Sequence, residues 1–538
     1  MSNFKNSYTS LPSKDTGYFS TLICHYLDKN KSLSPFYNHF PNLNGFKLQI
    51  EEKKNSIGTG SESRQILVSA LKKQYQKVNT SKKSLQNIDL LINQNTFTVT
   101  TGHQLNLFTG PLYFLYKIIT VINLAKELKE AYPTKNFVPI YWMATEDHDF
   151  EEINYFNFKD KKIKWERPFG GAVGHLSTKG LEDVFKEFSK NLSHHQFANE
   201  LKTLFKTAYL QHDNLADATF YLANELFKIY GLVIIDADNK ALKGMFSNIF
   251  KDELINETCY NAVSKSAEAL SALNYKVQVN PRKINLFYLL KNKRERIVFE
   301  KGKFKVLNSS LIFSKEEILN EVDKHPERFS PNVLMRPLYQ EHILPNLAYI
   351  GGGGELAYWL EMKTYFEKVG VKFPILLLRN SVLVVQKKQV LKLKKLKVNI
   401  NQLFLKQPKL IKEVVKEISV LKIDFSEQKL LLQKMFKDLK ELSNKTDKSF
   451  IGAVKAQEHK QIKGLEKLEK RLLRAQKRKY VELTNRIIEI QNQLFPNHSL
   501  QERYNNFSEI YLEIGPDFIP LLAKHLKPLA LEFGVLEI

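Results

Sequence analysis

The chain has little cysteine and no long apolar run. Its 538 residues contain two cysteines, Cys24 and Cys259, which form no CxxC pair and no Cys/His spacing typical of zinc, so we expect neither a structural metal nor a disulfide. Residues 373–385 are the most apolar stretch, but Arg379-Asn380-Ser381 interrupts them and excludes a membrane-spanning helix. Residues 1–15 are polar and lack the apolar segment of a secretory signal, which predicts a cytoplasmic protein without a membrane partner.

Acidic residues are scarce relative to basic ones, and the formal net charge is +24. Residues 387–486 contain 28 lysines and arginines against 11 aspartates and glutamates, a net charge of +17, so the rest of the chain carries only +7. This distribution excludes an enzyme body that is basic throughout. It indicates a near-neutral body with one basic helical module, which we interpret mainly as a solvated helical face, with nucleic-acid binding as the alternative.

The hydrophobic pattern predicts an α/β body with extra modules, because 538 residues exceed what one core can hold. The β-branched residues 97–100 predict a strand, the apolar residues 112–125 a helix, and residues 137–142 a second buried strand. Two such strands joined by a helical crossover form a βαβ unit.

The segment Thr101-Gly102-His103-Gln104 follows the first of these strands. We predict a glycine turn here that holds a nucleotide phosphate, because Gly102 lets the backbone approach a ligand and a helix N-terminus supplies unpaired N–H groups and about half a positive charge. The side chains of Thr101, His103 and Gln104 would then lie at the phosphates. The alternative is that the glycine serves only the turn.

Four consecutive glycines, 351–354, form a second segment of this kind, between a strand at 348–350 and an amphipathic helix at 356–369. Each glycine costs up to about 1 kcal/mol relative to alanine in regular structure. We therefore predict that the backbone here is pressed against a ligand, with Glu355 completing the nucleotide site.

Polar clusters also follow other strands. The strand at 137–142 ends in Glu146-Asp147-His148-Asp149, where ligands of open α/β sheets bind. His148 and Asp147 are candidate general bases, and the cluster is a candidate Mg²⁺ site, although it could instead cap the next helix. Asp236 and Asp238, which end another buried strand, are weaker candidates.

Two arginines border strand ends and are candidates for binding a carboxylate. Arg336 and Arg379 could each form two parallel hydrogen bonds to such a group. The alternative for each is a packing or surface ion pair.

The remaining patterns divide the chain into five regions. Alternating residues predict a small antiparallel meander at 276–279, 285–290, 296–299 and 303–307. A 3-4 apolar spacing from Ile462 to Leu494 predicts a coiled-coil seam that pairs with residues 409–442 in an antiparallel hairpin. The regions are N-terminal helices with the first half of the α/β core (1–160), inserted helices and strands (161–330), the second half of the core (331–385), the coiled coil (386–497) and a segment that docks on the core (498–538).

Seven strings recur in one order over essentially the whole chain: Thr100–Gln104, Leu107–Tyr113, Trp142–Phe150, Arg336-Pro337 with Gln340, Ala348–Glu355, Pro374 to Arg379 and Leu500–Arg503. In combination these motifs resemble those of the bacillithiol-biosynthesis cysteine-adding enzymes, the BshC family. One departure is that the family often has Gly-Gln-Gln where this chain has Gly102-His103-Gln104, which weakens the case that a histidine is required there.

The resemblance implies a Rossmann-like parallel-sheet core similar to that of class I aminoacyl-tRNA synthetases, with inserted connective segments and a C-terminal coiled coil used for homodimerisation. It also implies the last step of bacillithiol synthesis, in which cysteine is joined to glucosaminyl-malate through an amide bond. Because that condensation is uphill, we expect ATP to activate the cysteine carboxylate, with Mg²⁺ as a candidate partner of the nucleotide. Our assignments are catalysis by His148, Asp147 and His103; nucleotide binding by Thr101, Gly102, His103, Gln104, Gly351, Gly352, Gly353, Gly354 and Glu355; and substrate binding by Arg336, Gln340, Arg379, Lys117 and Trp142.

Two other hypotheses compete with the ligase. The basic helical module suggests a synthetase-like protein that binds RNA, whose affinity would fall steeply with salt. The coiled coil suggests a non-catalytic scaffold. We favour the ligase because two glycine segments and the family resemblance support it.

Overall fold

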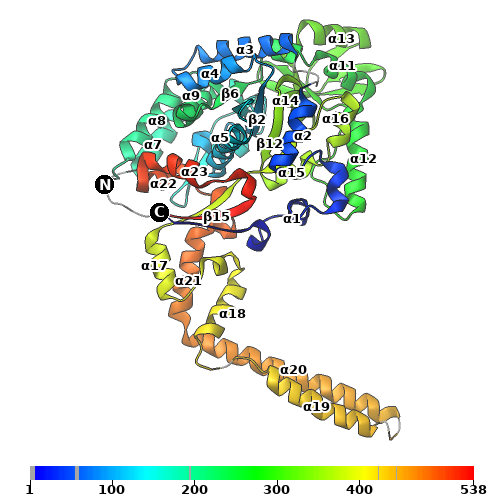
Figure 1. Cartoon of the computed structure of the whole chain (residues 1–538), viewed down its shortest axis with the longest axis vertical. Coiled ribbons are helices and arrows are strands. Elements are labelled where there is room, and N and C mark those ends of the chain that lie inside the picture. Colours follow the sequence, from blue (N-terminus) through cyan, green and yellow to red (C-terminus); the bar gives the residue numbers. More distant parts are fainter. Residues whose placement is uncertain (1–6, 55–59, 193–194, 422, 444, 447) are drawn as a thin grey trace. The chain divides into compact units, whose positions relative to one another are not determined.

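The computed structural model describes residues 7–54, 60–192, 195–421, 423–443, 445–446 and 448–538. The described chain forms two compact units (Figure 1). The core unit contains residues 7–383 and 499–536, and the helical unit contains residues 384–498 with 537–538. Among the helices described, none is long and apolar enough to span a bilayer.

A five-stranded parallel sheet forms the centre of the core unit, in the order β13-β12-β2-β3-β6. The chain starts at the middle strand β2, moves outward through β3 to β6, and returns to add β12 and β13 on the other side. This order gives a topological switch point between β2 and β12, the position where ligands of open α/β sheets bind. The strands are β2 (Thr96–His103), β3 (Asn136–Met143), β6 (Val233–Asp236), β12 (Asn346–Gly351) and β13 (Ile375–Leu378).

The predicted βαβ unit is present as β2, helix α5 (Tyr113–Ala131) and β3. Apolar residues of α5, including Val121 and Leu124, pack on Phe97 and Val99 of β2, and α2 (Leu43–Lys53) covers the same buried cluster. Burial of this apolar face, at about 25 cal/mol per Å², stabilises the crossover. The α/β, Rossmann-like prediction is therefore confirmed.

Other parts of the core unit differ from the sequence predictions. The strand β6, which falls within the region assigned to an insertion, pairs with β3 in the central sheet. Residues 276–279 form no strand because they lie beside Glu361, whose carboxylate accepts the backbone N–H groups of Gln278 and Val279. The predicted helix at 356–369 is two helices, α15 (Gly353–Trp359) and α16 (Lys363–Val369).

The antiparallel sheet contains five strands in the order β10-β9-β8-β7-β11. The edge strand β11 follows helix α13 (Lys315–Lys324) in the chain and pairs with β7. A capping box between Ser314 and Glu317 fixes the N-terminus of α13. The strands are β7 (Leu286–Leu290), β8 (Lys293–Glu300), β9 (Lys303–Val306), β10 (Ile312–Phe313) and β11 (Phe329–Pro331). A two-stranded ribbon of β4 (Tyr155–Phe158) and β5 (Lys161–Lys164) lies apart from it.

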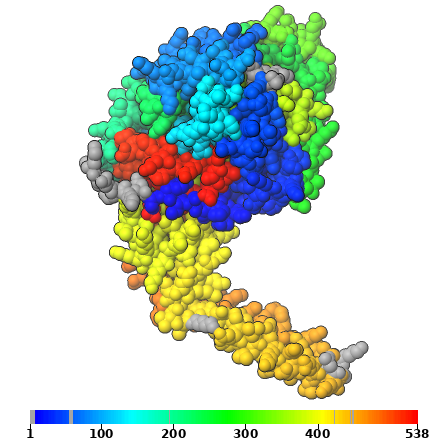
Figure 2. All heavy atoms as spheres, viewed as in Figure 1, coloured from blue at the N-terminus to red at the C-terminus, as the bar shows by residue number. Residues whose placement is uncertain are grey.

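Residues 499–536 pack against the rest of the core unit. Asn123 of α5 donates hydrogen bonds to the backbone of Ala523 and Leu526, and β1 (Tyr8–Pro12) pairs with β15 (Glu532–Glu537). Figure 2 shows these C-terminal residues in red against the blue N-terminal ones.

The remaining core helices surround these sheets (Figure 1). They are α1 (Thr21–Leu27), α3 (Ser61–Tyr75), α4 (Lys82–Leu90), α6 (Phe150–Ile153), α7 (Leu181–Asn191), α8 (Ala198–Leu210), α9 (Leu215–Phe227), α10 (Lys240–Gly244), α11 (Ser247–Asn256), α12 (Thr258–Ala272), α14 (Met335–Ile343), α22 (Phe507–Ile514) and α23 (Phe518–His525).

The helical unit contains an antiparallel hairpin, as predicted, but the two predicted long helices are each divided. Residues 409–442 fall in one helix that ends at Ile418 and another that begins at Ser426, and the seam at 462–494 falls in one that ends at Lys479 and another that begins at Val481. Helices α19 and α20 run side by side, with Lys429 paired to Glu469 and Lys440 to Glu458, a register that only antiparallel helices give. The strand β14 (Ser381–Val385) carries the chain into this unit. Its helices are α17 (Lys387–Lys395), α18 (Gln407–Ile418), α19 (Ser426–Ser443), α20 (Lys448–Lys479) and α21 (Val481–Leu494).

Candidate active site

A cavity of about 430 Å³ lies at the carboxyl ends of β2, β3 and β6. It falls beside the switch point of the sheet and is closed by residues from β8, α14 and α15. Its size is typical of small-molecule sites. The predicted site residues that line it are Gly102, His103, Gln104, Lys117, Trp142, Asp147, Arg336 and Glu355.

The two glycine segments end adjacent parallel strands, as the phosphate hypothesis requires. The hydroxyl of Thr101 donates to the carbonyl of Ile350 at 2.7 Å, which joins β2 to β12. Gly102, however, continues β2 and forms no turn, because the strand extends to His103. Thr101 itself is buried in the sheet and does not reach the cavity.

The residues Gly351–Gly354 do not line the cavity, so the structure does not support their predicted contact with a ligand. None of them has a positive φ. A Cβ at Gly351 would lie 3.0 Å from Tyr349 and 3.1 Å from the Cβ of Glu355, so close packing accounts for this glycine. The backbone N–H of Gly352 donates to the Glu355 carboxylate, which occupies the position proposed for a phosphate.

Glu355 and Lys117 form a buried ion pair at the cavity wall. The Lys117 ammonium lies 2.6 Å from Glu355 Oε1 and donates to the carbonyl of Gly102 at 2.8 Å. Tyr349 donates to the other carboxylate oxygen. Burial alone would raise the pKa of Glu355, but Lys117 lowers it below its usual range. The Lys117 charge is therefore already balanced, which weakens its assignment to a substrate carboxylate.

Arg336 is a cation of the cavity without a carboxylate partner in the described part of the chain. Its guanidinium lies 5.8 Å from the ring centre of Trp142 and 5.7 Å from that of Tyr349. Nη1 donates to Gln340 Oε1 at 3.0 Å, whereas Nη2 has no hydrogen-bond partner. Gln340 is fully buried and bonds to Glu341, so it positions the arginine instead of touching a ligand.

Asp147 lines the cavity, but His148 does not. Asp147 accepts hydrogen bonds from Gln104 and from the backbone N–H of His148. Arg294 donates to Nδ1 of His148 at 2.9 Å, so the lone pair that a general base needs is occupied. Burial and the Arg294 charge lower the pKa of His148. The structure thus favours Asp147 over His148 for a catalytic role.

His103 is a neutral histidine with a fixed tautomer. Its Nδ1 lies 2.7 Å from the carbonyl of Gln104 and must carry the proton, since a carbonyl only accepts. Its ring packs against Tyr113 and Phe114. Burial and the Lys117 charge lower the pKa of His103 to about 3. The side chain therefore acts as a hydrogen-bonding group and not as an acid or base near neutral pH.

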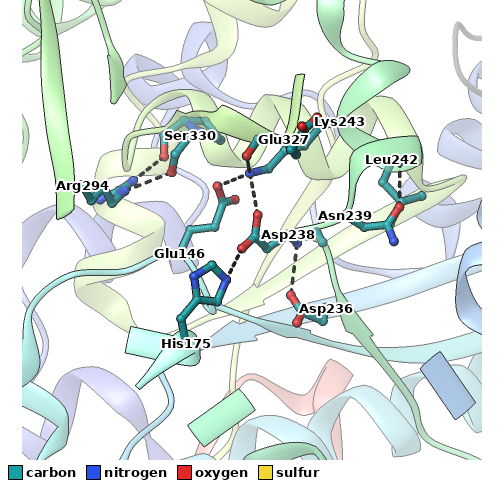
Figure 3. Close-up of polar contacts among 12 residues, drawn as sticks. Glu146, His175, Asp236, Asp238, Asn239, Leu242, Lys243, Arg294, Glu327 and Ser330 are labelled. Atoms are coloured by element: carbon teal, nitrogen blue, oxygen red, sulfur yellow. Dashed lines mark hydrogen bonds and ion pairs between the residues drawn. The ribbon is translucent and has the colours of Figure 1, made fainter. Parts of the chain in front are cut away.

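A buried lysine organises the acidic side of the cavity (Figure 3). The Lys243 ammonium lies 2.6 Å from Glu146 and 2.7 Å from Asp238, and it donates to the carbonyl of Glu327. Burial alone would raise the pKa of Asp238, but Lys243 and His175 lower it to about 2. Burial and the Asp238 charge raise the pKa of Asp236 to about 6.

Arg379 lies outside the cavity, contrary to its predicted role in substrate binding. Its Nη2 bonds to Glu502 at 2.7 Å and its Nη1 to Ser381, and both members of the ion pair are nearly fully buried. The alternative reading, a packing ion pair, is correct for this residue.

No metal site is preformed in the described part of the chain. Among described residues, no group of three or more histidine, cysteine or acidic side chains is arranged to hold an ion. The predicted cluster at 146–149 is otherwise engaged, since Glu146 binds Lys243 and Asp147 binds Gln104.

Several cavity residues were missed by the sequence reasoning. They come from distant elements: Arg294 from β8, and Glu152 from α6, while Lys243 from α10 lies behind the wall. The sequence does indicate the acidic residues Asp238 and Glu146, because each follows a strand of the sheet. No local pattern marks Arg294 or Lys243, since only the folded chain brings them to this edge.

Comparison with known proteins decides the family. The model for the BshC N-terminal Rossmann-like domain of bacillithiol biosynthesis matches residues 7–380, and the model for the BshC C-terminal coiled-coil domain matches residues 382–538. The chain belongs to the BshC family. Three relatives named "Putative cysteine ligase BshC" support this. The one from Flavobacterium johnsoniae is 56% identical and the one from Flavobacterium psychrophilum 57% identical, and each match covers 97% of this chain and 98% of the relative. The one from Christiangramia forsetii is 54% identical, and the match covers 97% of both chains. In this BshC-family chain, the cavity lies in the Rossmann-like part and the hairpin in the coiled-coil part.

Proposed function

We propose that the chain joins the carboxyl group of cysteine to the amine of glucosaminyl-malate, as the last step of bacillithiol synthesis. The observation that carries this proposal is the match to the BshC family over nearly the full length of relatives named as cysteine ligases. The cavity supports it, because it combines cations for carboxylates with acidic groups for an amine.

Amide formation from a free carboxylate is uphill, so we propose that ATP activates cysteine as an adenylate or an acyl phosphate. Arg336 and Arg294 line the cavity and are paired with no carboxylate in the described residues, so they are suited to phosphate oxygens. Mg²⁺ would arrive with the nucleotide, since the described residues offer no preformed site for it.

An isotope experiment tests the reaction. The purified chain would be incubated with ATP, glucosaminyl-malate and cysteine that carries ¹⁸O in its carboxyl group, and the products analysed by mass spectrometry. The proposal expects the amide product together with one ¹⁸O atom in AMP or in phosphate. Product without ¹⁸O transfer would contradict activation by ATP, and absence of product would contradict the ligase. Deletion of the gene should also abolish bacillithiol and let glucosaminyl-malate accumulate; normal thiol levels would oppose the proposal.

We also propose a homodimer through the hairpin of α19 and α20. Apolar side chains on one face of α19 are exposed in the single chain, with Leu431 at 69%, Met435 at 50% and Leu442 at 54% exposure. Large exposed apolar groups in one stripe are typical of a protein interface.

A further inference from the structure

A second cavity, of about 310 Å³, adjoins the first within the core unit. Gln104, Tyr113 and Glu152 line both cavities, so the two cavities meet at these three side chains, which form their shared wall. The reaction proposed above needs two organic substrates whose reacting groups meet. Two cavities with a common wall match that requirement.

The second cavity is lined mainly by hydrogen-bonding groups. Asn106, Asn157 and Tyr155 contribute amide and phenol groups, and Arg503 is the single cation among the lining residues described. Asn106 is only 7% exposed and donates to the carbonyl of Glu152, while its Oδ1 accepts no hydrogen bond. A buried acceptor left unpaired is costly, which favours a ligand that brings hydroxyl or amine donors.

The backbone that carries Arg503 is firmly held. Asn157 donates to the carbonyl of Tyr504, and the N–H of Leu112 donates to the carbonyl of Asn505. Asn506, fully buried, bonds to the carbonyls of Phe108 and Gly110. The Arg503 side chain itself is exposed and has no ion pair with any described residue. A cation on a fixed backbone with no partner is suited to a ligand carboxylate.

Resting on the proposed ligation, we propose that this second cavity binds the amine substrate, a polyhydroxylated sugar that bears carboxylates. Its carboxylates lie at Arg503, its hydroxyl groups meet the amides of Asn106 and Asn157, and its amine lies at the shared wall. The activated cysteine occupies the first cavity, with its carbonyl carbon beside the same three side chains, so that it meets the amine there.

Glu152 is then placed to take a proton. Its Oε2 accepts from Gln104 at 2.7 Å, and its Oε1 has no partner among the described residues. The amine nitrogen attacks the activated carbonyl carbon of cysteine and forms the C–N bond. The bond from that carbon to the phosphate oxygen breaks, and AMP or phosphate leaves with the electron pair. The proton lost by the nitrogen passes to Glu152.

Steady-state kinetics of the full-length chain test the subsite. Arg503→Met should raise the KM for glucosaminyl-malate about tenfold, as expected for loss of one charge-assisted contact near the surface, and leave the KM for cysteine unchanged. The neutral acceptor methyl glucosaminide should show no difference between this variant and the wild type. The matched control Arg282→Met removes an exposed arginine that lines neither cavity, and it should behave as wild type. An unchanged KM for glucosaminyl-malate, or an equal loss with the neutral acceptor, would overturn the assignment.

The variant Glu152→Gln tests the proton-transfer step separately. Glu152→Gln should lower kcat at least about tenfold, as loss of a proton acceptor does, with little change in the KM for glucosaminyl-malate. A change confined to KM would overturn its role as proton acceptor. If the wild type makes no amide, the ligase proposal fails, but calorimetric binding of glucosaminyl-malate still tests the subsite. Equal affinity of the wild type and Arg503→Met would then refute it.

Discussion

Lys243 offers the sharpest test of how the acidic wall of the cavity is built. The side chain is fully buried between Glu146 and Asp238, so Lys243→Met leaves two carboxylates without their cation. Removing one partner of a buried ion pair typically costs about 3–5 kcal/mol. Protonation limits this cost, because Glu146 can become neutral. The free energy needed to protonate it is about 1.4 kcal/mol for each pH unit above its unperturbed pKa.

The destabilisation of Lys243→Met should depend on pH, because protonation of Glu146 becomes easier as the pH falls. Burial already raises the pKa of Glu146, and loss of Lys243 should raise it further. We therefore expect the destabilisation to be about 3–5 kcal/mol at pH 7 and smaller by about 2–3 kcal/mol at pH 5. Asp238 retains its contact with His175 at 2.7 Å, so most of the change arises at Glu146.

Urea unfolding followed by tryptophan fluorescence measures the effect. The chain has three tryptophans, Trp142, Trp165 and Trp359, all buried in the core unit, so the signal reports that unit alone. The control is Lys240→Met, in which an exposed lysine 3.7 Å from Glu327 is lost, with an expected cost below about 1 kcal/mol. Equal stability of the two variants at pH 7, or a difference that does not narrow at pH 5, would refute the reasoning.

Three further predictions concern other parts of the chain. His103→Gln should keep kcat/KM within about threefold, because a neutral amide also supplies a donor and an acceptor, and the pH–rate profile between pH 5.5 and 7.5 should not change; a lost inflection would show that His103 titrates. Burial raises the pKa of Glu361 to about 7, so the native state binds this proton more tightly than the unfolded state does, and the core unit should gain stability as the pH falls from 8 to 5. The urea midpoint of Glu361→Gln should rise less over this range, and an equal rise of the midpoint in the variant and the wild type would contradict the prediction. Replacing Leu431 and Met435 by lysine should convert a dimer to a monomer in sedimentation, whereas an unchanged mass would place any dimer interface elsewhere.

Local sequence patterns were sufficient to predict β2 and α5, the strand and helix that carry Gly102, His103 and Lys117 of the cavity. The β-branched run before Gly102 and the apolar run after Leu112 predicted β2 and α5, because burial on a parallel sheet imposes those patterns. The same reasoning failed at Gly102, which continues the strand. A glycine in the sequence can mark a turn, but it can also mark a strand end that lies close to other side chains. At Gly102 an added Cβ would lie 3.4 Å from the Tyr349 hydroxyl and 3.5 Å from Nη1 of Arg336.

The remaining site depends on long-range packing. Arg379 and Arg336 were both predicted at strand borders, but Arg336 lies in helix α14 and only Arg379 follows a strand directly. Arg379 is paired with Glu502 in a segment more than a hundred residues away. Lys243 and Arg294 likewise acquire their roles only when α10 and β8 are placed beside the sheet. No local sequence pattern indicates which distant residues become neighbours, so Lys243 and Arg294 were not predicted.

The most direct test of the cavity as the site of ligation is the activity of Arg336→Met. Its guanidinium lines the cavity with Nη2 unpaired, held by Gln340 and by two aromatic rings. Loss of about 3 kcal/mol of charge-assisted bonding to an anionic substrate would lower kcat/KM for cysteine ligation about 100-fold, with the urea midpoint close to that of Arg282→Met. Ligation within twofold of the wild type would contradict the assignment of this cavity as the active site.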